Sequence, residues 1–542
     1  MPAARDDLVA PGTPDEVEIT DQPRKPVFDP TVGIPLETDF PRDRANEPPH
    51  RLVVIGDSLS QGFQSGAVYN TDVSFPAIIA TELGWFDHYE YPRYGGPGGL
   101  PLNIEYLLRD LERRYGDAVN WWEAPGAIFH ARRLMDEIED YWERGPGSDA
   151  PTTGTIHDLA VYGWDLRDAL ERTAASCRDA LEKPKDDPIK QLVQNDSARA
   201  ALRVYPSARD RAHDTLFAAA ERLGEDTNDG KADRGIETLV IFLGANNALQ
   251  AVTELRVTWS EDNGFRDLRK KGAYTVWRPS HFRQELDEVV AAVRRVPARH
   301  VIWCTVPHVT VVPVARGVGG KLGPGSRYFP YYTRPWIDPE RFDPGKDPCI
   351  TGAQARAVDS TIDQYNEDIA RAVADARQGN LEGDDGRGRD WYLLDTAGLL
   401  DRLAARRYIE DPDARPSWWS PYPLPPALAS LKPPPDSRFL TSNGEGGRER
   451  GGLFSLDGVH PTTIGYGLIA QEMVNIMRRA GVVFRHIDGA PRRDPVTVDF
   501  DRLIRRDSLA LKPPQNLSPG LKTLGWADEA LDAIKRALRV TA

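Results

Sequence analysis

Cysteine is scarce in this chain, and long apolar segments are missing. Three cysteines among 542 residues are too few and too scattered for a disulfide framework. One of them, Cys304, lies in an apolar run and is expected in the core rather than as a nucleophile. No run approaches the ~20 apolar residues of a membrane helix, and the amino-terminal residues lack a signal-peptide core. We therefore expect no integral membrane segment and, by default, a soluble cytoplasmic protein.

Positive charge is also in short supply. The chain has 68 Lys and Arg residues against 82 Asp and Glu residues, a formal net charge of −14. Because nucleic-acid phosphates are bound by clustered Lys and Arg, this balance argues against nucleic acid as the main partner. Four histidines without partners at ligand spacing also argue against a metal site: His213, His281, His300 and His486.

The composition changes along the chain and suggests three parts. Residues 1–49 are rich in Pro, Asp and Glu and are expected to form an extended or disordered arm. Residues 50–485 form the main domain, with inserts at about 85–150, 165–232, 313–350 and 405–452. The last two inserts are loop-like and carry aromatic clusters, interpreted as a lid or a sugar-stacking platform, or as anchors onto the core. Residues 486–542 are a carboxyl-terminal extension with a predicted final helix over 527–540.

Short apolar runs in the main domain predict a parallel sheet. Runs of this kind, with helical stretches such as 282–295 and 359–376 between them, indicate βαβ units buried on both faces. The fold class is therefore α/β, a three-layer α/β/α sandwich with a five-stranded, mostly parallel sheet. Ligands bind at the carboxyl ends of such strands. The predicted strands cover residues 51–55, 155–161, 237–243, 300–305 and 391–394.

The first strand ends in Gly56-Asp57-Ser58, which places a hydroxyl at a sharp turn. A serine becomes a nucleophile only when a base takes its proton and that base is held in place. The alternative is that Ser58 or Asp57 caps the next helix. Ser60 stands where the Gly-x-Ser-x-Gly elbow has its last glycine, which argues against the α/β-hydrolase fold.

A base and its orienting acid are found about four hundred residues later, in Asp457-Gly458-Val459-His460. Residues three apart project from the same side of a helical turn, so one segment supplies both groups. Asp395, at the end of the fifth strand, is a rival orienting acid with poorer spacing.

Two further strand ends carry candidate oxyanion donors. Gly163 follows the second strand, where its N–H is an available donor or the residue simply forms a turn. Asn246 follows the third strand and is expected to donate its amide to an oxyanion, while Asn247 caps the next helix. Asn247 and His308 are also candidate substrate contacts, with plain packing as the alternative for His308.

These blocks, in this order, resemble the SGNH (GDSL-type) hydrolase superfamily. Three departures stand out: Asn247 replaces the usual Asp, Asp158 replaces the usual Asn, and the chain is about twice the usual length. The resemblance leaves the arm, the inserts and the tail unexplained. The matching residues are Ser58 in Gly-Asp-Ser-Leu, Gly163 in the second block, Asn246 in the third, and Asp457 with His460 in Asp-x-x-His-Pro.

The resemblance implies a flavodoxin-like SGNH fold and a serine ester hydrolase, either carboxylesterase or lipase-like. It implies an acyl-enzyme on Ser58 and an oxyanion hole made by the N–H groups of Ser58 and Gly163 and the amide of Asn246. No metal or organic cofactor is implied, and the substrate is a small-molecule, lipid or sugar ester. Alternatives are a carbohydrate O-deacetylase, an acyltransferase, or an idle binding module. Acyl chain length and oligomeric state stay open.

Overall fold

The structure is a computed structural model, and the carboxyl-terminal helix expected over 527–540 lies outside the residues it describes. The described residues are 9–20, 22–35, 47–117, 119, 122–149, 154–181, 193–205, 209–226, 235–379, 390–493 and 495–517.

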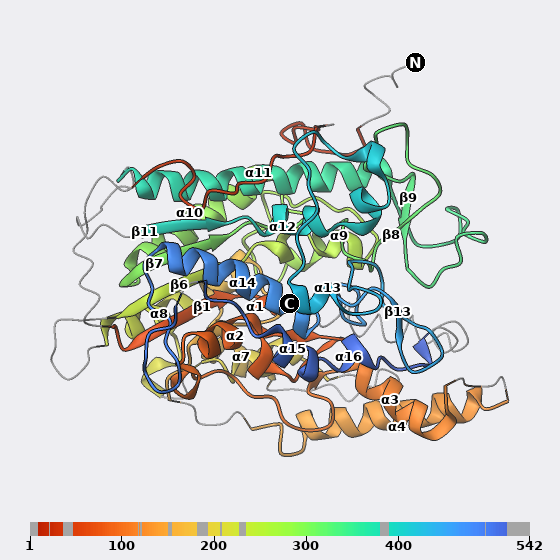
Figure 1. Cartoon of the computed structure of the whole chain (residues 1–542), viewed down its shortest axis with the longest axis horizontal. Helices are drawn as coiled ribbons and strands as arrows, with labels where there is room; N and C mark the ends of the chain where they lie inside the picture. Colours follow the sequence, from red (N-terminus) through yellow and green to blue (C-terminus); the bar gives the residue numbers. More distant parts are fainter. Residues whose placement is uncertain are drawn as a thin grey trace.

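Five parallel strands form the centre of the molecule (Figure 1). Every residue of four of these strands is buried, as expected for a sheet covered on both faces. The predicted α/β class and the five strands are confirmed, and the sheet is entirely parallel. The strands are β1 (His50–Gly56), β5 (Asp158–Ala160), β6 (Ile236–Phe242), β7 (Ala298–Cys304) and β11 (Asp390–Leu394).

The order of the strands determines where a ligand can bind. Across the sheet they run β5-β1-β6-β7-β11, which in chain order is 2-1-3-4-5, the flavodoxin-like arrangement. In this order the chain leaves β1 toward one edge of the sheet and later builds from β6 toward the other. A crevice therefore opens at the carboxyl ends of β1 and β6. Ser58 follows β1 and Asn246 follows β6, so both residues lie at this crevice.

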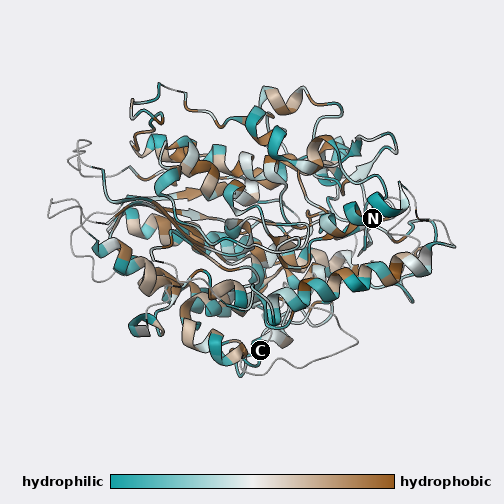
Figure 2. Ribbon diagram, turned by 90° about the horizontal axis from the view of Figure 1, so that it is seen from below, coloured by the Kyte–Doolittle hydropathy of each residue, from teal (hydrophilic) through white to brown (hydrophobic). Residues whose placement is uncertain are grey.

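Helices cover both faces of the sheet. On one face α2 packs against β1 and α14, and α14 packs against β11. On the other face α8, α5, α10 and α11 pack in sequence from β5 to β11. Figure 2 shows the mainly hydrophobic strands between these helical layers. The helices are α2 (Phe75–Glu82), α5 (Leu166–Glu171), α8 (Leu216–Glu225), α10 (Pro279–Arg295), α11 (Gly352–Arg377) and α14 (Thr463–Arg479).

Two of the long helices begin at side-chain caps that the sequence encodes locally. The Thr351 side chain accepts a hydrogen bond from the backbone amide of Gln354, and the Gln354 side chain accepts one from the backbone amide of Thr351. These two bonds form a capping box for α11. The Thr462 side chain caps α14 by accepting a hydrogen bond from the backbone amide of Gly465, without a reciprocal bond. This cap lies two residues after His460 and sets the start of α14 at Thr463, and so helps to place the imidazole.

The inserts add small antiparallel sheets and further helices around the main domain. The insert 313–350, expected to be loop-like, contributes three short strands that form one sheet. Its aromatic Tyr332 is buried, and in the next insert Tyr422 donates a hydrogen bond to Glu472 on α14 at 2.7 Å. These contacts agree with the anchor interpretation. The remaining strands and α-helices, inside and outside the inserts, are β2 (Phe63–Gln64), β3 (Ala67–Val68), β4 (Leu100–Pro101), β8 (Arg316–Val318), β9 (Tyr331–Thr333), β10 (Ile350–Thr351), β12 (Thr441–Ser442), β13 (Arg448–Arg450), α1 (Ser58–Gln61), α3 (Ile104–Tyr115), α4 (Ala124–Glu143), α6 (Ala174–Leu181), α7 (Asp196–Ala201), α9 (Gln250–Thr253), α12 (Thr396–Leu403), α13 (Pro426–Ala429), α15 (Phe500–Arg506) and α16 (Ser508–Leu511).

Among the helices of the described residues, none has the length and apolar character that a membrane-crossing segment needs.

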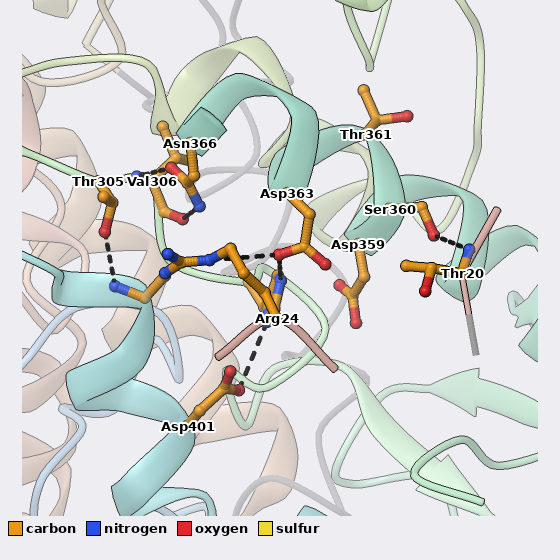
Figure 3. Close-up of polar contacts among 12 residues, drawn as sticks. Thr20, Arg24, Thr305, Val306, Asp359, Ser360, Thr361, Asp363, Asn366 and Asp401 are labelled. Atoms are coloured by element: carbon orange, nitrogen blue, oxygen red, sulfur yellow. Dashed lines mark hydrogen bonds and ion pairs between the residues drawn. The ribbon is translucent and has the colours of Figure 1, made fainter. Parts of the chain in front are cut away.

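The described part of the amino-terminal arm packs on the main domain in an extended course. The Leu393 amide of β11 donates to the Pro30 carbonyl at 2.8 Å, so the arm runs beside the edge strand. The Arg377 guanidinium at the end of α11 donates to the Ile34 carbonyl at 2.7 Å. Further along, the Thr20 amide donates to the Ser360 hydroxyl of α11 (Figure 3). The arm therefore covers the β11 edge, where unpaired backbone groups would otherwise be exposed.

A buried ion cluster joins this arm to the core. Arg24 bonds to Asp395 and lies 3.7 Å from Asp363 (Figure 3). The His308 imidazole contacts Asp363 at 2.9 Å and Asp401 at 3.4 Å. Burial alone would lower the pKa of His308, but the surrounding carboxylates outweigh burial and raise it to about 10. His308 is therefore a positive charge within the cluster.

Replacement of His308 by Asn is expected to flatten the pH dependence of stability above neutral pH. The unfolded chain releases the His308 proton near its ordinary pKa of 6.5, whereas the folded protein holds it up to about 10. The unfolded state thus binds fewer protons in this window, and the free energy of unfolding falls as pH rises. The expected contribution is about 1.4 kcal/mol for each pH unit.

Urea unfolding at about pH 7 and about pH 9 measures this slope. The control is His213→Asn, because His213 is exposed and lies outside the cluster. An His308→Asn protein with the wild-type slope would contradict the assignment.

Candidate active site

Ser58, His460 and Asp457 form one chain of hydrogen bonds. The Ser58 hydroxyl oxygen lies 2.8 Å from His460 Nε2, and His460 Nδ1 lies 3.0 Å from Asp457 Oδ2. All three are buried, with exposed fractions of 3%, 0% and 2%. The structure therefore brings together the three residues that the sequence nominated as nucleophile, base and orienting acid.

Asp457 is held by backbone amides as well as by the imidazole. Its Oδ1 accepts from the amides of Val459 and His460, each at 2.8 Å, and its Oδ2 accepts from the Gly66 amide at 3.0 Å. Burial would raise the pKa of this carboxyl, but His460 and the amides outweigh burial and the pKa is lowered. Asp457 is therefore an ionised acceptor that fixes the position of the ring.

The segment that carries Asp457 and His460 is a turn and not the expected helical turn. Gly458 has a φ of 67°, in the left-handed region, and α14 begins only at Thr463. A glycine at this position lets the chain reverse without strain. The two side chains still meet, because Asp457 accepts from the backbone of the residues that follow it.

Ser58 is presented at the first position of the short helix α1. Asp57 caps this helix by accepting from the Leu59 amide at 3.0 Å, so the cap alternative applies to Asp57. A Cβ atom at Gly56 would lie 2.1 Å from Ser60 Oγ, which explains the glycine before the turn. Burial raises the pKa of Asp57 to about 7.

The loop after β5 is hydrogen-bonded on one side to α1 and on the other to the residues that follow β6. Gln61 of α1 accepts from the Tyr162 amide at 2.9 Å, and the Asn246 side-chain amide donates to the Trp164 carbonyl at 2.8 Å. Gly163 lies between these contacts with a φ of 76°. Its N–H makes no hydrogen bond to any described residue. Because an amide nitrogen carries two hydrogens, Asn246 keeps one further donor.

Asn247 lies in a different environment from Asn246. Its side chain accepts from the Leu166 amide and donates to Glu285, both at 3.4 Å, and it is fully buried. The next helix, α9, has Leu249 at its N-cap and no side-chain cap. The expected cap by Asn247 is therefore wrong, because a short 3₁₀ turn at 245–247 precedes α9.

Two other candidates lie away from the Ser58–His460 pair. His308 is engaged in the buried ion cluster described above, and the adjacent Pro307 and Val309 line the cavity instead. The packing alternative therefore describes His308 better than a substrate contact. Asp395 caps α12 and bonds to Arg24, so it does not orient His460.

An apolar cavity of about 110 Å³ opens beside Ser58 and His460. Its walls come from the ends of β6 and β7 and from α12 and α14. Apart from the two catalytic candidates and Thr396, the wall is built from apolar residues and glycine. The apolar wall includes Phe242, Val309, Leu399, Leu400, Leu403 and Leu468. A cavity of this composition accepts a hydrocarbon group more readily than a sugar, because it offers few hydrogen-bond partners.

Sequence reasoning missed the cavity wall and the role of Gly66. The leucines of α12 have helical spacing, which predicts a packed face but does not say what it faces. Gly66 contributes through its backbone amide, and a backbone contact of this kind leaves no recognisable residue pattern in the sequence.

Among the described residues, no group of three or more His, Cys, Asp or Glu side chains is arranged to hold a metal ion.

The crevice between β1 and β6 thus holds a hydrogen-bonded Ser-His-Asp chain, two candidate oxyanion donors beyond Ser58, and an apolar cavity. Comparisons with protein-family models, with curated proteins and with solved structures give no match to this chain.

Proposed function

We propose that the protein is a serine ester hydrolase that forms an acyl-enzyme on Ser58. The observation that carries this proposal is the 2.8 Å contact between the Ser58 hydroxyl and His460 Nε2. A base at this distance, itself oriented by a buried carboxylate, is the arrangement that activates a hydroxyl. The resemblance to the SGNH (GDSL-type) hydrolases supports the same reaction class.

In the first step the Ser58 oxygen attacks the ester carbonyl carbon and His460 Nε2 takes the hydroxyl proton. Asp457 accepts the Nδ1–H, holds the tautomer and stabilises the imidazolium. The carbon–oxygen bond to the leaving alcohol then breaks, and His460 returns the proton to that oxygen. In the second step water attacks the acyl-enzyme with His460 as base, which releases the acid and restores the Ser58 hydroxyl.

The negative oxygen of the tetrahedral intermediate needs donors that are already in place. The proposed donors are the N–H groups of Ser58 and Gly163 and the remaining amide hydrogen of Asn246. They come from the ends of β1, β5 and β6, which are neighbours in the sheet. Support for Asn246 comes from its bond to the Trp164 carbonyl, which points the amide toward the Gly163 loop.

The apolar cavity favours an ester whose acyl group is a short hydrocarbon. A cavity of about 150 Å³ holds a benzene ring, so about 110 Å³ leaves room for roughly four carbons. An acetyl group would leave most of this space empty, and a long chain would have to leave the cavity. The same argument favours a carboxylesterase over a carbohydrate deacetylase.

Replacement of Ser58 by Ala should abolish both turnover and covalent labelling. Without the hydroxyl no acyl-enzyme forms, and losses on the order of 10⁶ in kcat are typical. The measurement pairs p-nitrophenyl butyrate hydrolysis with fluorophosphonate labelling and mass mapping of the labelled peptide. The control is Ser430→Ala, because Ser430 is exposed and its hydroxyl donates to the Ala427 carbonyl rather than to a triad residue. Wild-type turnover in a folded Ser58→Ala protein would refute the mechanism, and failure of the wild type to label would favour an idle module.

Replacement of Asn246 by Ala should lower kcat by a factor on the order of 10²–10³, with little change in KM. The reason is that an oxyanion donor acts on the transition state more than on the bound ester. Asn247→Ala is the matched control, since it removes the contact to Glu285 and should affect the melting temperature more than kcat. Equal losses of kcat in the two variants would argue against the donor role.

Activity should be highest on esters with short acyl chains. A narrower cavity should shift the preferred acyl chain to a still shorter length. Across p-nitrophenyl esters, butyrate should exceed palmitate in kcat/KM. Leu400→Phe places a larger side chain in the wall and should lower activity on butyrate relative to acetate. Leu170→Phe, on α5 and outside the wall, serves as control. A Leu400→Phe protein with an unchanged chain-length profile would contradict this use of the cavity.

A further inference from the structure

A second cavity, of about 420 Å³, lies behind the wall of the first. The two are separated by the segment that follows β7, because Val309 and Val312 line the apolar cavity while Val311 and Pro313 line the second. Unlike the first, the second cavity is rich in cations. Six of its lining residues are arginines: Arg316, Arg327, Arg406, Arg407, Arg438 and Arg450.

Two of these arginines have carboxylate partners within the protein. Arg407 bonds to Asp359 at 2.7 Å, and Arg438 bonds to Asp436 at 2.6 Å. Among the described residues, Glu410 is the only carboxylate residue that lines the cavity, and it also contacts Arg438. The four remaining arginines form no ion pair with a described residue: Arg316, Arg327, Arg406 and Arg450. In a chain of net charge −14, this local excess of positive charge is unexpected.

Arg327 carries the strongest indication of a missing partner. Its side chain is buried, with an exposed fraction of 4%, yet none of its three guanidinium nitrogens makes a hydrogen bond with a described residue. The neighbouring hydroxyls of Tyr328 and Tyr408 lie near it without forming a hydrogen bond of good geometry, and both groups are neutral. The charge of Asp359 favours the guanidinium, but only from beyond ion-pair distance. The Tyr328 ring, 5.1 Å away, offers only a cation–π contact. Buried charges are costly unless they are paired, so this group has an unmet demand for acceptors.

The crowding of like charges agrees with this demand. Burial and the neighbouring Arg406 and Arg450 lower the pKa of Arg316 to about 10. An anion in the cavity would remove both the repulsion among these groups and the lack of acceptors on Arg327. Guanidinium groups match oxyanions in shape as well as charge, since each presents parallel N–H donors to two oxygens.

The size and walls of the cavity indicate more than a bare ion. Its volume lies within the range of about 300–1,000 Å³ that is usual for small-molecule sites. Phe329, Tyr332 and Phe439 contribute aromatic surface beside the arginines. A single carboxylate would neutralise only one of the four unpaired cations, whereas a phosphoryl group brings a second charge and a third oxygen.

We propose that this arginine cavity binds the phosphoryl group of a small organic phosphate ester. The site is separate from Ser58, so binding should be the same in Ser58→Ala protein. Failure of this proposal and failure of the hydrolase proposal are therefore distinguishable. The shared chemistry also covers a phosphorylated lipid headgroup, and the experiment separates the two sources.

The test is isothermal titration calorimetry and thermal unfolding of the full chain with phenyl phosphate, inorganic phosphate, phenol, and vesicles that contain phosphatidic acid. Phenyl phosphate should bind and raise the melting temperature, phenol should not, and higher salt should weaken binding. Arg327→Met and Arg450→Gln should each weaken binding about tenfold or more. The exposed Arg269→Gln is the matched control.

Arg327→Met separates ligand binding from a structural role. Because the substitution removes an unpaired buried charge, the ligand-free variant should melt at or above the wild-type temperature while losing the phosphate-dependent increase. If that variant does not fold, Arg450→Gln, at an exposed position, decides the question alone. If the protein binds the phosphatidic acid vesicles but not phenyl phosphate, the phosphoryl group that it recognises belongs to a lipid. Absence of binding to every phosphate, or binding unchanged in both variants, would overturn the proposal.

Discussion

The contact between Ser58 and His460 joins two segments that lie 402 residues apart, and its geometry depends on a second contact between the same segments. The turn after β2 is hydrogen-bonded to the segment before His460. The Ser65 amide donates to the Ser455 hydroxyl at 2.8 Å, and the Gly66 amide donates to the Asp457 carboxylate at 3.0 Å. Ser65 adopts a φ of 50°, an uncommon conformation for a residue with a side chain. The stretch that presents Ser58, the proposed nucleophile, therefore also holds Asp457, the carboxylate that orients His460.

Those parts of the structure that follow from local patterns could be predicted from the sequence. The five strands were predictable because continuous apolar runs of this length are stable only between two layers. The strand ends were predictable as a site because parallel strands bring their carboxyl ends to one edge. Asp457 and His460 were predictable as a pair because the chain is too short between them to separate them, even though the segment forms a turn around Gly458 rather than a helix.

The features that could not be predicted are contacts between segments that are far apart in the chain, because the sequence pattern does not show which of these segments meet. His308 follows a strand like the site residues do, but Asp363 of α11 and Asp401 of α12 draw it into an ion cluster. The arm that was expected to be extended or disordered contributes Arg24 to that cluster, and no periodicity in the arm indicates this docking. The apolar cavity is likewise a gap between α12, α14 and two strand ends, so its residues carry the same apolar pattern as a packed core.

The ion cluster around His308 and the second cavity around Arg327 both contain buried arginines, but the first indicates a structural role and the second a binding site. Around His308, each cation faces carboxylates: Arg24 meets Asp395 and Asp363, and Arg407 meets Asp359. Such a cluster is complete within the protein and needs no ligand, because the charges compensate one another. Around Arg327 the same kind of burial occurs without a carboxylate at ion-pair distance among the described residues, because Asp359 acts on it only from farther away and Tyr328 and Tyr408 are neutral. Both regions share the segment after β7, but the charges around His308 are paired with carboxylates, whereas the second cavity is lined by arginines that keep donors for an anion.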